Sequence, residues 1–292
     1  DLVRSRGLGD VYKRQTYYGM KRIVLFILVI ILNQYSLSAQ EGQFKEKEVF
    51  RNDDVVFRQI DGHTWVGTGK LVSNESMYLI EGNDKAILID AGTKIAGLDK
   101  IVKSLTTRPV ILIATHVHPD HTGTAVNCFP EIYLNAADIP NVPMFMPNYK
   151  GTIKYLKDGE IFDLGGRQIE VVFTPGHTPG STSFIDKDAA YGFSGDAFNS
   201  YLLLTTNFST LIASCERMAD TLKKFGITHF YTGHYYGGDV GTLQLLNNMI
   251  TLSKDILTGR REGKTNPGGM LGLNKSANAY GITINYSDAQ MK

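Results

Sequence analysis

Three histidines and one aspartate lie within six consecutive residues of this chain. They are His116, His118, Asp120 and His121, and they directly follow the apolar run 110–114, which is typical of a buried strand. A loop that follows a buried strand is a usual place for a functional site in an α/β fold. A folded chain gains no packing from such polar side chains and must solvate or pair each one. The cluster therefore indicates a site.

Metal binding explains these residue types together. Neutral imidazole and carboxylate groups are ligands of zinc and of other borderline divalent ions. His116 and His118 are two residues apart, so an extended segment aims both rings to the same side. Asp120 and His121 are adjacent on the following turn and are placed to serve a second ion. The alternative, a group of polar side chains that are merely solvated or paired, is disfavoured because four of them occur together.

Further motifs connect this cluster with a known family. Residues 116–121 resemble the HxHxDH signature of the metallo-β-lactamase superfamily, and the remaining motifs of that family follow in the same order. The resemblance covers about residues 55–260. The matching positions outside the cluster are Asp90, His177, Asp196 and His234.

The resemblance implies a site for two zinc ions (Zn2+) per chain. The implied ligands are His116, His118 and His177 for one ion, Asp120, His121 and His234 for the other, and Asp196 as the bridging ligand. Two ions about 3.5–4 Å apart share a hydroxide and polarise the substrate oxygen. Asp120 is also expected to orient the hydroxide or to pass a proton to the leaving group. Asp90 is expected to hold the histidine loop by hydrogen bonds.

The elements that must position these residues follow from periodicity and turn signals. Short strands are predicted at 55–60, 63–67, 77–80, 86–89, 110–114, 131–134, 170–174, 182–185, 189–193, 227–231 and 280–284. Helices are predicted at 95–105, 122–128, 207–225 and 241–259, whereas 139–149 is apolar, broken by proline and without a period. Together with the resemblance, this order predicts an α/β fold, a four-layer αββα metallo-β-lactamase sandwich in a single domain.

The N-terminal region predicts export. Two basic residues precede the apolar run 23–32, and a small-residue stretch ends at Ala39, which is the pattern of a secretory signal peptide over 20–39. Residues 1–19 are interpreted as a non-native leader, and 40–292 as the metallo-β-lactamase-fold hydrolase domain with its core at about 55–260. The mature chain is then periplasmic or secreted, with no stable membrane insertion after signal cleavage.

Composition restricts the partners. The formal net charge is +1 and no long charge run is present, which argues against nucleic acid as the main partner. A small-molecule substrate is expected, and the oligomeric state stays open. The two cysteines, Cys128 and Cys215, either pair in an exported protein or remain free thiols.

The function expected is that of an exported metal-dependent hydrolase. An aspartate at 196 together with His121 resembles glyoxalase-II-like thioesterases and lactonases, and a β-lactamase-like activity also stays open. The bond that such an enzyme is expected to cleave is the carbonyl bond of an ester, lactone, thioester or β-lactam in a small molecule. The alternatives are a persulfide-dioxygenase-like enzyme with a single iron, or a phosphodiesterase that uses the same metal site, and the sequence leaves zinc, iron and manganese as candidate metals.

Overall fold

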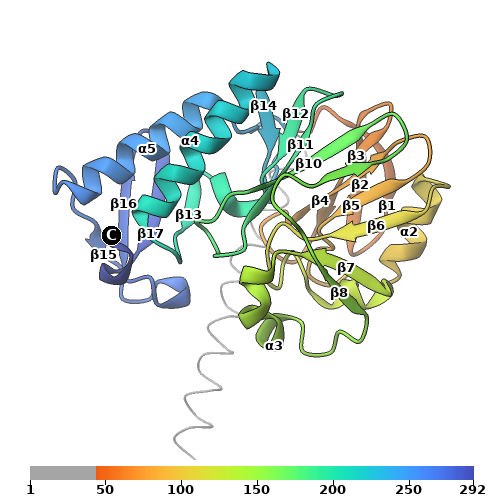
Figure 1. Ribbon diagram of the computed structural model, residues 1–292. Helices are drawn as coiled ribbons and strands as arrows, with labels where there is room; N and C mark the ends of the chain where they lie inside the picture. The colour runs from red at the N-terminus through yellow and green to blue at the C-terminus, as the bar shows by residue number, and fades with distance from the viewer. Residues whose placement is uncertain (1–43) are drawn as a thin grey trace, which may run out of the picture.

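The computed structural model describes residues 44–292, so the expected leader 1–19 and signal peptide 20–39 lie outside the described residues. Three sheets and a small number of helices make up this part of the chain (Figure 1). Within residues 44–292 no helix combines the length and the apolar character that crossing a membrane requires.

The first sheet has eight strands in the order of the sequence. Its first five strands pair antiparallel and the last four pair parallel, with β5 shared between the two parts. The bounds are β1 (Lys47–Arg51), β2 (Val55–Asp61), β3 (Thr64–Gly69), β4 (Ser76–Glu81), β5 (Ala86–Ile89), β6 (Val110–Ile113), β7 (Glu131–Leu134) and β8 (Thr152–Tyr155).

The second sheet has five strands in the order β14-β12-β11-β10-β9, and the third has four in the order β13-β17-β16-β15. In the second sheet β12 and β14 are parallel, and the other pairs are antiparallel. The bounds are β9 (Ile161–Asp163), β10 (Gln168–Phe173), β11 (Thr182–Asp186), β12 (Tyr191–Phe193), β13 (Tyr201–Leu203), β14 (His229–Tyr231), β15 (Lys264–Thr265), β16 (Lys275–Ala279) and β17 (Ile282–Tyr286).

The two long helices, α4 and α5, cover the second sheet. The side chain of Asn207 accepts a hydrogen bond from the Thr210 amide at the start of α4, and Gly226 ends α4 in a left-handed conformation. The helix bounds are α2 (Leu98–Leu105), α3 (Val142–Phe145), α4 (Phe208–Phe225) and α5 (Leu243–Leu257), with short 3-10 helices η1 (Thr124–Cys128), η2 (Ala136–Asn141), η3 (Gly195–Phe198), η4 (Met270–Gly272) and η5 (Asp288–Gln290).

A hydrophobic core lies between each pair of neighbouring layers, three cores in all, which confirms the predicted αββα sandwich. Alternation along the strands assigns neighbouring residues to different cores: Leu79 packs towards α2, whereas Ile80 packs between the two sheets. On the second sheet Phe184 faces the core between the sheets, and Ile185 faces α4 and α5. The third sheet packs on the same helices, and of its four strands the sequence predicted only β17, at 280–284 (Figure 1).

Arg167 connects the first two sheets at one end of the sandwich. Its guanidinium is paired with the buried carboxylate of Asp186 at 2.6 Å and donates to the Thr64 hydroxyl and to the carbonyl oxygens of His63 and Glu81. Tyr191 of the second sheet also donates a hydrogen bond to Asp61 of the first. Polar contacts at the rim therefore supplement the apolar contacts between the sheets.

Several predicted elements differ from the structure. The helix predicted at 122–128 was wrong, because only the 3-10 helix η1 forms and the Thr122 side chain binds the His118 carbonyl oxygen. The proline-broken segment 139–149 contains the end of η2 and the short helix α3, with proline in its first turn. Both cysteines are free: Cys215 is on the buried face of α4, in the core that α4 and α5 form with the sheets, and Cys128 is half-buried.

Candidate metal centre

The loops that carry the candidate ligands meet at one edge of the two central sheets. His116 to His121 follow the parallel strand β6, and Asp90 follows its neighbour β5. Asp196 follows β12 and His234 follows β14, and these two strands are also parallel neighbours. The carboxyl ends of parallel strands gather their loops at one edge, which is where ligands bind in such sheets.

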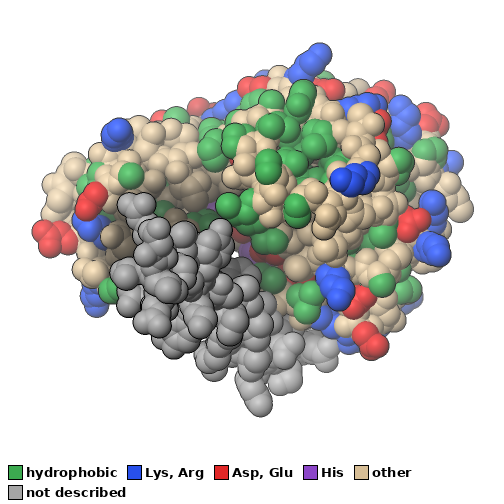
Figure 2. All heavy atoms as spheres, turned by 90° about the horizontal axis from the view of Figure 1, so that it is seen from below, with side chains coloured by type: hydrophobic (Ala, Val, Ile, Leu, Met, Phe, Trp, Pro, Cys, Tyr) green, Lys and Arg blue, Asp and Glu red, His purple; other side chains and the backbone are tan. Residues whose placement is uncertain are grey.

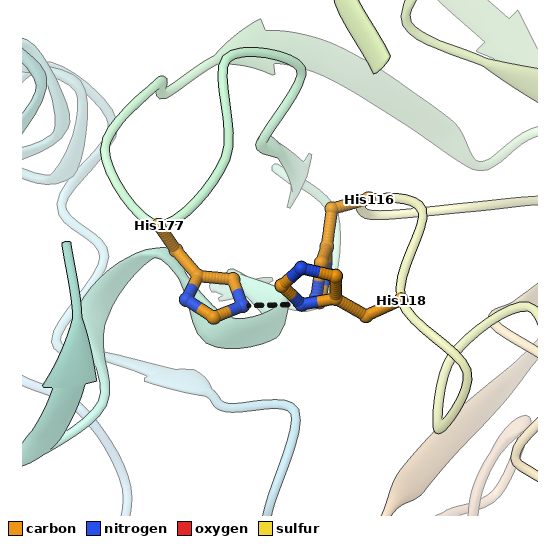
Figure 3. A group of neighbouring side chains, drawn as sticks. All are labelled: His116, His118 and His177. Atoms are coloured by element: carbon orange, nitrogen blue, oxygen red, sulfur yellow. Dashed lines mark hydrogen bonds between the residues drawn. The ribbon is translucent and has the colours of Figure 1, made fainter. Parts of the chain in front are cut away.

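Three histidine rings form the first group. The Nε2 atom of His116 lies 3.1 Å from Nδ1 of His118, and Nε2 of His177 lies 2.9 Å from the same His118 atom. Figure 3 shows the His177 and His118 rings directed towards each other from opposite loops, with His116 beside them. All three histidines are buried. Three ring nitrogens therefore converge on one small volume.

A second group contains two carboxylates and two histidines. Asp120, His121, Asp196 and His234 each offer one ligand atom, and these atoms lie within 4.8 Å of one another. Asp196 stands between the groups: its Oδ2 lies 3.2 Å from His234 Nε2 and 3.7 Å from His177 Nε2. This arrangement brings together all seven residues expected as ligands, with Asp196 at the position of a bridge.

Hydrogen bonds orient most of these rings from behind. The Nδ1 atom of His177 donates to the Leu203 carbonyl oxygen at 2.9 Å, and that of His234 donates to the Ser73 carbonyl oxygen at 3.0 Å. The Nδ1 atom of His121 donates to Asp90 at 2.8 Å. A donor on the outer nitrogen fixes the tautomer and leaves the lone pair of the inner nitrogen directed into the site.

Asp90 makes the hydrogen bonds expected of it. Its carboxylate accepts from the Thr115 amide at 2.7 Å and from the Thr115 hydroxyl at 2.8 Å, in addition to His121. The backbone of Asp90 is left-handed, with φ of 61°, which is uncommon for a residue with a side chain. The buried hydrogen bonds of its carboxylate hold this conformation in place.

The electrostatics differ between the two groups. Burial lowers the pKa of His118 to about 3 and the pKa of His116 well below its usual value, so both imidazoles are neutral. Burial also disfavours a charged His234, but Asp196 outweighs it and raises the pKa of His234 to about 9. Burial is likewise outweighed at His121, where Asp196, Asp90 and Asp120 raise the pKa. The first group thus offers neutral lone pairs, whereas in the second group the carboxylates favour protonated imidazoles.

These residues fit a pair of divalent ions. The Nε2 atom of His121 is buried and has no hydrogen-bond partner among the described residues, although its other nitrogen is held by Asp90. An unpaired buried nitrogen is costly unless a ligand takes it up. Imidazole nitrogens and carboxylate oxygens are also the donors that zinc prefers. The first group can hold one ion, and the second group can hold another.

Other histidines and some tyrosines lie outside this arrangement. His63 is exposed beside Glu81, and His229 is half-buried in β14, so neither belongs to the site. The Tyr235 hydroxyl donates a hydrogen bond to Glu46, and the Tyr236 hydroxyl donates one to the Ser73 carbonyl oxygen. One neighbour of the site was missed: Asn199 donates to Asp196 at 2.8 Å, and nothing in its local sequence distinguishes it. The Phe145 ring of the apolar segment 139–149 lies 5.4 Å from that of His118.

Comparison with known proteins identifies the class of protein. Residues 72–234 match the sequence profile of the Metallo-beta-lactamase superfamily, which is more than half of the chain. The chain therefore belongs to the metallo-β-lactamase superfamily, and it is an enzyme of the metallo-hydrolase class, as its motifs predict.

Named relatives carry different activities. The chain is 25% identical over 219 residues to an acyl-coenzyme A thioesterase of Homo sapiens, with 60% of this chain and 78% of the relative covered. It is 28% identical over 143 residues to a hydroxyacylglutathione hydrolase of Haemophilus influenzae, with 42% and 66% covered. It is 30% identical over 218 residues to a mitochondrial persulfide dioxygenase of Bos taurus, with 67% and 82% covered.

A solved structure supports the fold. The metallo-β-lactamase of Pontibacter korlensis superposes with a TM-score of 0.55 at 20% sequence identity, and the match covers 69% of this chain and 99% of that one. At 20% sequence identity, this structural similarity supports the fold alone.

Proposed function

We propose that this protein is a hydrolase with two zinc ions that cleaves the carbonyl–sulfur bond of a small thioester. The observation that carries the proposal is the position of the Asp196 carboxylate, whose oxygens lie 3.2 Å from His234, 3.5 Å from His121 and 3.7 Å from His177. Two separate donor groups that share one carboxylate suit two ions better than one.

Asp120 and Asn199 have different roles in such a site. Bound zinc ions of this kind lower the pKa of a coordinated water to about 7 and polarise a carbonyl oxygen. Asp120 is half-buried, with its Oδ2 3.5 Å from His234 and 3.8 Å from His121, so its carboxylate is placed to accept a proton and to return it to the leaving thiol. Asn199 holds the Asp196 carboxylate in its orientation.

Apolar side chains beside the histidines favour an organic acyl group. The Phe145 ring stands perpendicular to that of His118, and the neighbouring Met144 is 73% exposed. Figure 2 shows a small area of histidine between the two halves of the molecule with hydrophobic side chains beside it. Methionine adapts its shape to varied ligands, and a phenylalanine ring excludes water from the bond to be cleaved.

Relatives support the choice of a thioester. Two of the named relatives act on an acyl group attached to a thiol, as their names state: an acyl-coenzyme A thioesterase and a hydroxyacylglutathione hydrolase. The chemistry at the carbonyl is the same for esters, lactones and β-lactams, so these substrates are the closest competitors.

The test measures metal content and turnover on the same purified protein. Elemental analysis is expected to give about two zinc ions per chain, and a panel of an acyl thioester, an ester, a lactone, a chromogenic cephalosporin and a phosphodiester is expected to show fastest turnover of the thioester. If the protein turns over only an ester, lactone or cephalosporin, the hydrolase assignment stands and the proposed thiol leaving group is wrong.

A persulfide dioxygenase is the second candidate, because the Bos taurus relative is 30% identical. The complete second donor group, Asp120, His121 and His234, favours two ions over a single iron. One iron per chain with oxygen consumption and no hydrolysis would replace the proposed function with this one.

We also propose that the protein is exported. The basic pair before the apolar run 23–32 and the small residues up to Ala39 support this proposal. Expression of the full chain in a bacterium with a periplasm is expected to release a protein that begins at residue 40. A full-length cytosolic product would contradict it.

A further inference from the structure

Asp138 lies outside every motif of the metal centre, yet it is completely buried next to it. The residue belongs to the 3-10 helix η2, and its relative exposure is 0%. A carboxylate is rarely buried in this way unless specific donors satisfy it. The role of Asp138 therefore depends on which groups donate to it.

All donors to this carboxylate belong to two loops that carry histidines. One oxygen accepts from the Val117 amide at 2.8 Å, and Val117 is the residue between His116 and His118. The same oxygen accepts from the Thr178 hydroxyl at 2.9 Å, and the other oxygen accepts from the Gly180 amide at 2.7 Å. Thr178 is the residue after His177, so a single side chain joins the two loops of the three-histidine group.

Gly180 has the structure that this contact requires. A Cβ atom at Gly180 would lie 2.5 Å from Cγ of Asp138, closer than such atoms approach. The absence of a side chain therefore permits the carboxylate to reach the loop backbone.

Asp138 also has no competing role in its own helix. The cap of η2 is the side chain of Asn135, which accepts from the Ala137 amide at 3.0 Å. The carboxylate of Asp138 is thus available for the two loops alone. One backbone contact, from the Thr182 amide to the Thr115 carbonyl oxygen at 2.8 Å, joins the same region from the other side.

We infer that Asp138 is a positioning residue that sets the separation of the His116–His118 loop and the His177 loop, and thereby the affinity of the three-histidine group for its metal ion. The hydrogen bonds of the Asp138 carboxylate go to Val117, Thr178 and Gly180, and none goes to a ligand side chain. It acts by fixing the backbone at Val117 and at Gly180, because a buried carboxylate with three donors has one favourable position. The inference rests on the proposed metal site and is independent of the substrate.

The test compares the zinc affinity of Asp138→Asn with that of the wild type, by titration of metal-free protein with Zn2+ against a chromophoric chelator. The amide replaces one accepting oxygen by a group that donates, so at least one of the two loops loses a hydrogen bond to residue 138. Zinc affinity at the three-histidine group is expected to fall about 10–100-fold, which is the range for residues that orient ligands from behind. Excess zinc is expected to restore kcat with KM unchanged.

Two further variants separate positioning from general destabilisation. Asp186→Asn removes another fully buried carboxylate, the partner of Arg167, and is expected to lower thermal stability while zinc affinity stays at the wild-type value. Thr178→Val removes a single donor to Asp138, keeps the shape of the side chain, and is expected to weaken zinc binding in the same direction by a smaller factor.

Two outcomes would overturn the inference, and a third would affect only the proposed function. Wild-type zinc affinity in both Asp138→Asn and Thr178→Val would overturn it, and so would an equal loss of affinity in Asp186→Asn. A wild-type protein that binds zinc but hydrolyses no substrate would remove the proposed function, and the loss of affinity in Asp138→Asn would still support the role of Asp138.

Discussion

At the scale of single residues, the site depends on which nitrogen of each histidine faces inwards. His121 shows this most clearly, since its Nδ1 donates a hydrogen bond to Asp90, and its Nε2 is buried without a hydrogen-bond partner among the described residues. His177 and His234 are fixed in the same sense by carbonyl oxygens. The chemistry therefore resides in the orientation of the rings as much as in their number.

Replacement of a ligand should abolish turnover and leave the fold intact. His118→Ala is expected to eliminate hydrolysis because the first donor group loses one of its three nitrogens, and Asp120→Ala is expected to lower kcat about 10²–10⁴-fold through loss of proton transfer. Steady-state kinetics with circular dichroism measures both effects. His63→Ala, at an exposed histidine outside the site, is the matched control and should retain full activity. Full activity in His118→Ala would disprove the assignment.

Much of the site could be predicted from the sequence, for a physical reason. Ligands close together in the chain, His116 to His121, are visible as a cluster because their spacing alone brings them together. His177, Asp196 and His234 were found only through family motifs, since loop convergence is a property of the folded sheets. Asp138 was missed because its contacts join residues that are 21 to 42 positions away in the chain.

At the scale of elements, strands with buried alternating residues were predictable and edge strands were not. The strands β4 and β5 are buried along their length and match the predicted ranges closely. The strands β8 and β9 are mostly exposed or half-buried, so no hydrophobic period marks them. In the third sheet only β17 was predicted, by the run 280–284, because β15 and much of β16 are polar and exposed.

The polar contact between the sheets predicts a dependence of stability on pH. Burial would raise the pKa of Asp61, but the hydrogen bond from Tyr191 outweighs it together with other contacts, and the net shift is downward. A lowered pKa in the folded state gives stability that is present above pH 3.8, the unfolded value, and is lost as the pH falls through the folded pKa.

Asp61→Asn should therefore be less stable than the wild type at pH 7, by about 1 kcal/mol, and this difference should shrink below pH 4. Urea unfolding of metal-free protein at the two pH values gives the measurement. Asp220→Asn, at a side chain that is 81% exposed, is the control and should leave the stability unchanged. A difference that grows as the solution becomes acidic would refute the assigned direction.

At the scale of the whole molecule, the metal centre joins loops from both central sheets. Asp120 follows the first sheet, and Asp196 and His234 follow the second. Bound ions would thus stabilise the packing of the two sheets in addition to supplying chemistry, because a ligand that binds only the folded state adds to its stability.

Removal of metal should lower the melting temperature. Zinc at about 100 times its Kd adds about 2.7 kcal/mol, which corresponds to a shift of about 5–10 °C for a domain of this size. Calorimetry of the protein before and after treatment with a chelator measures the shift, and added zinc should reverse it. An unchanged melting temperature after complete loss of metal would show that the ions do not stabilise the folded state.

The core between the two sheets also has a consequence for synthesis on the ribosome. Tyr78 and Ile80 of β4 pack against Phe193 and Tyr231, which lie more than a hundred residues later in the chain. At about 5–20 residues per second, the inner face of the first sheet stays uncovered for on the order of 10 s while the second sheet is made. During that interval the nascent chain presents a broad apolar surface to its surroundings. Ribosome-bound chains that end before β10 should therefore recruit a general chaperone, and chains that extend beyond β14 should release it; equal recruitment at both lengths would contradict this expectation.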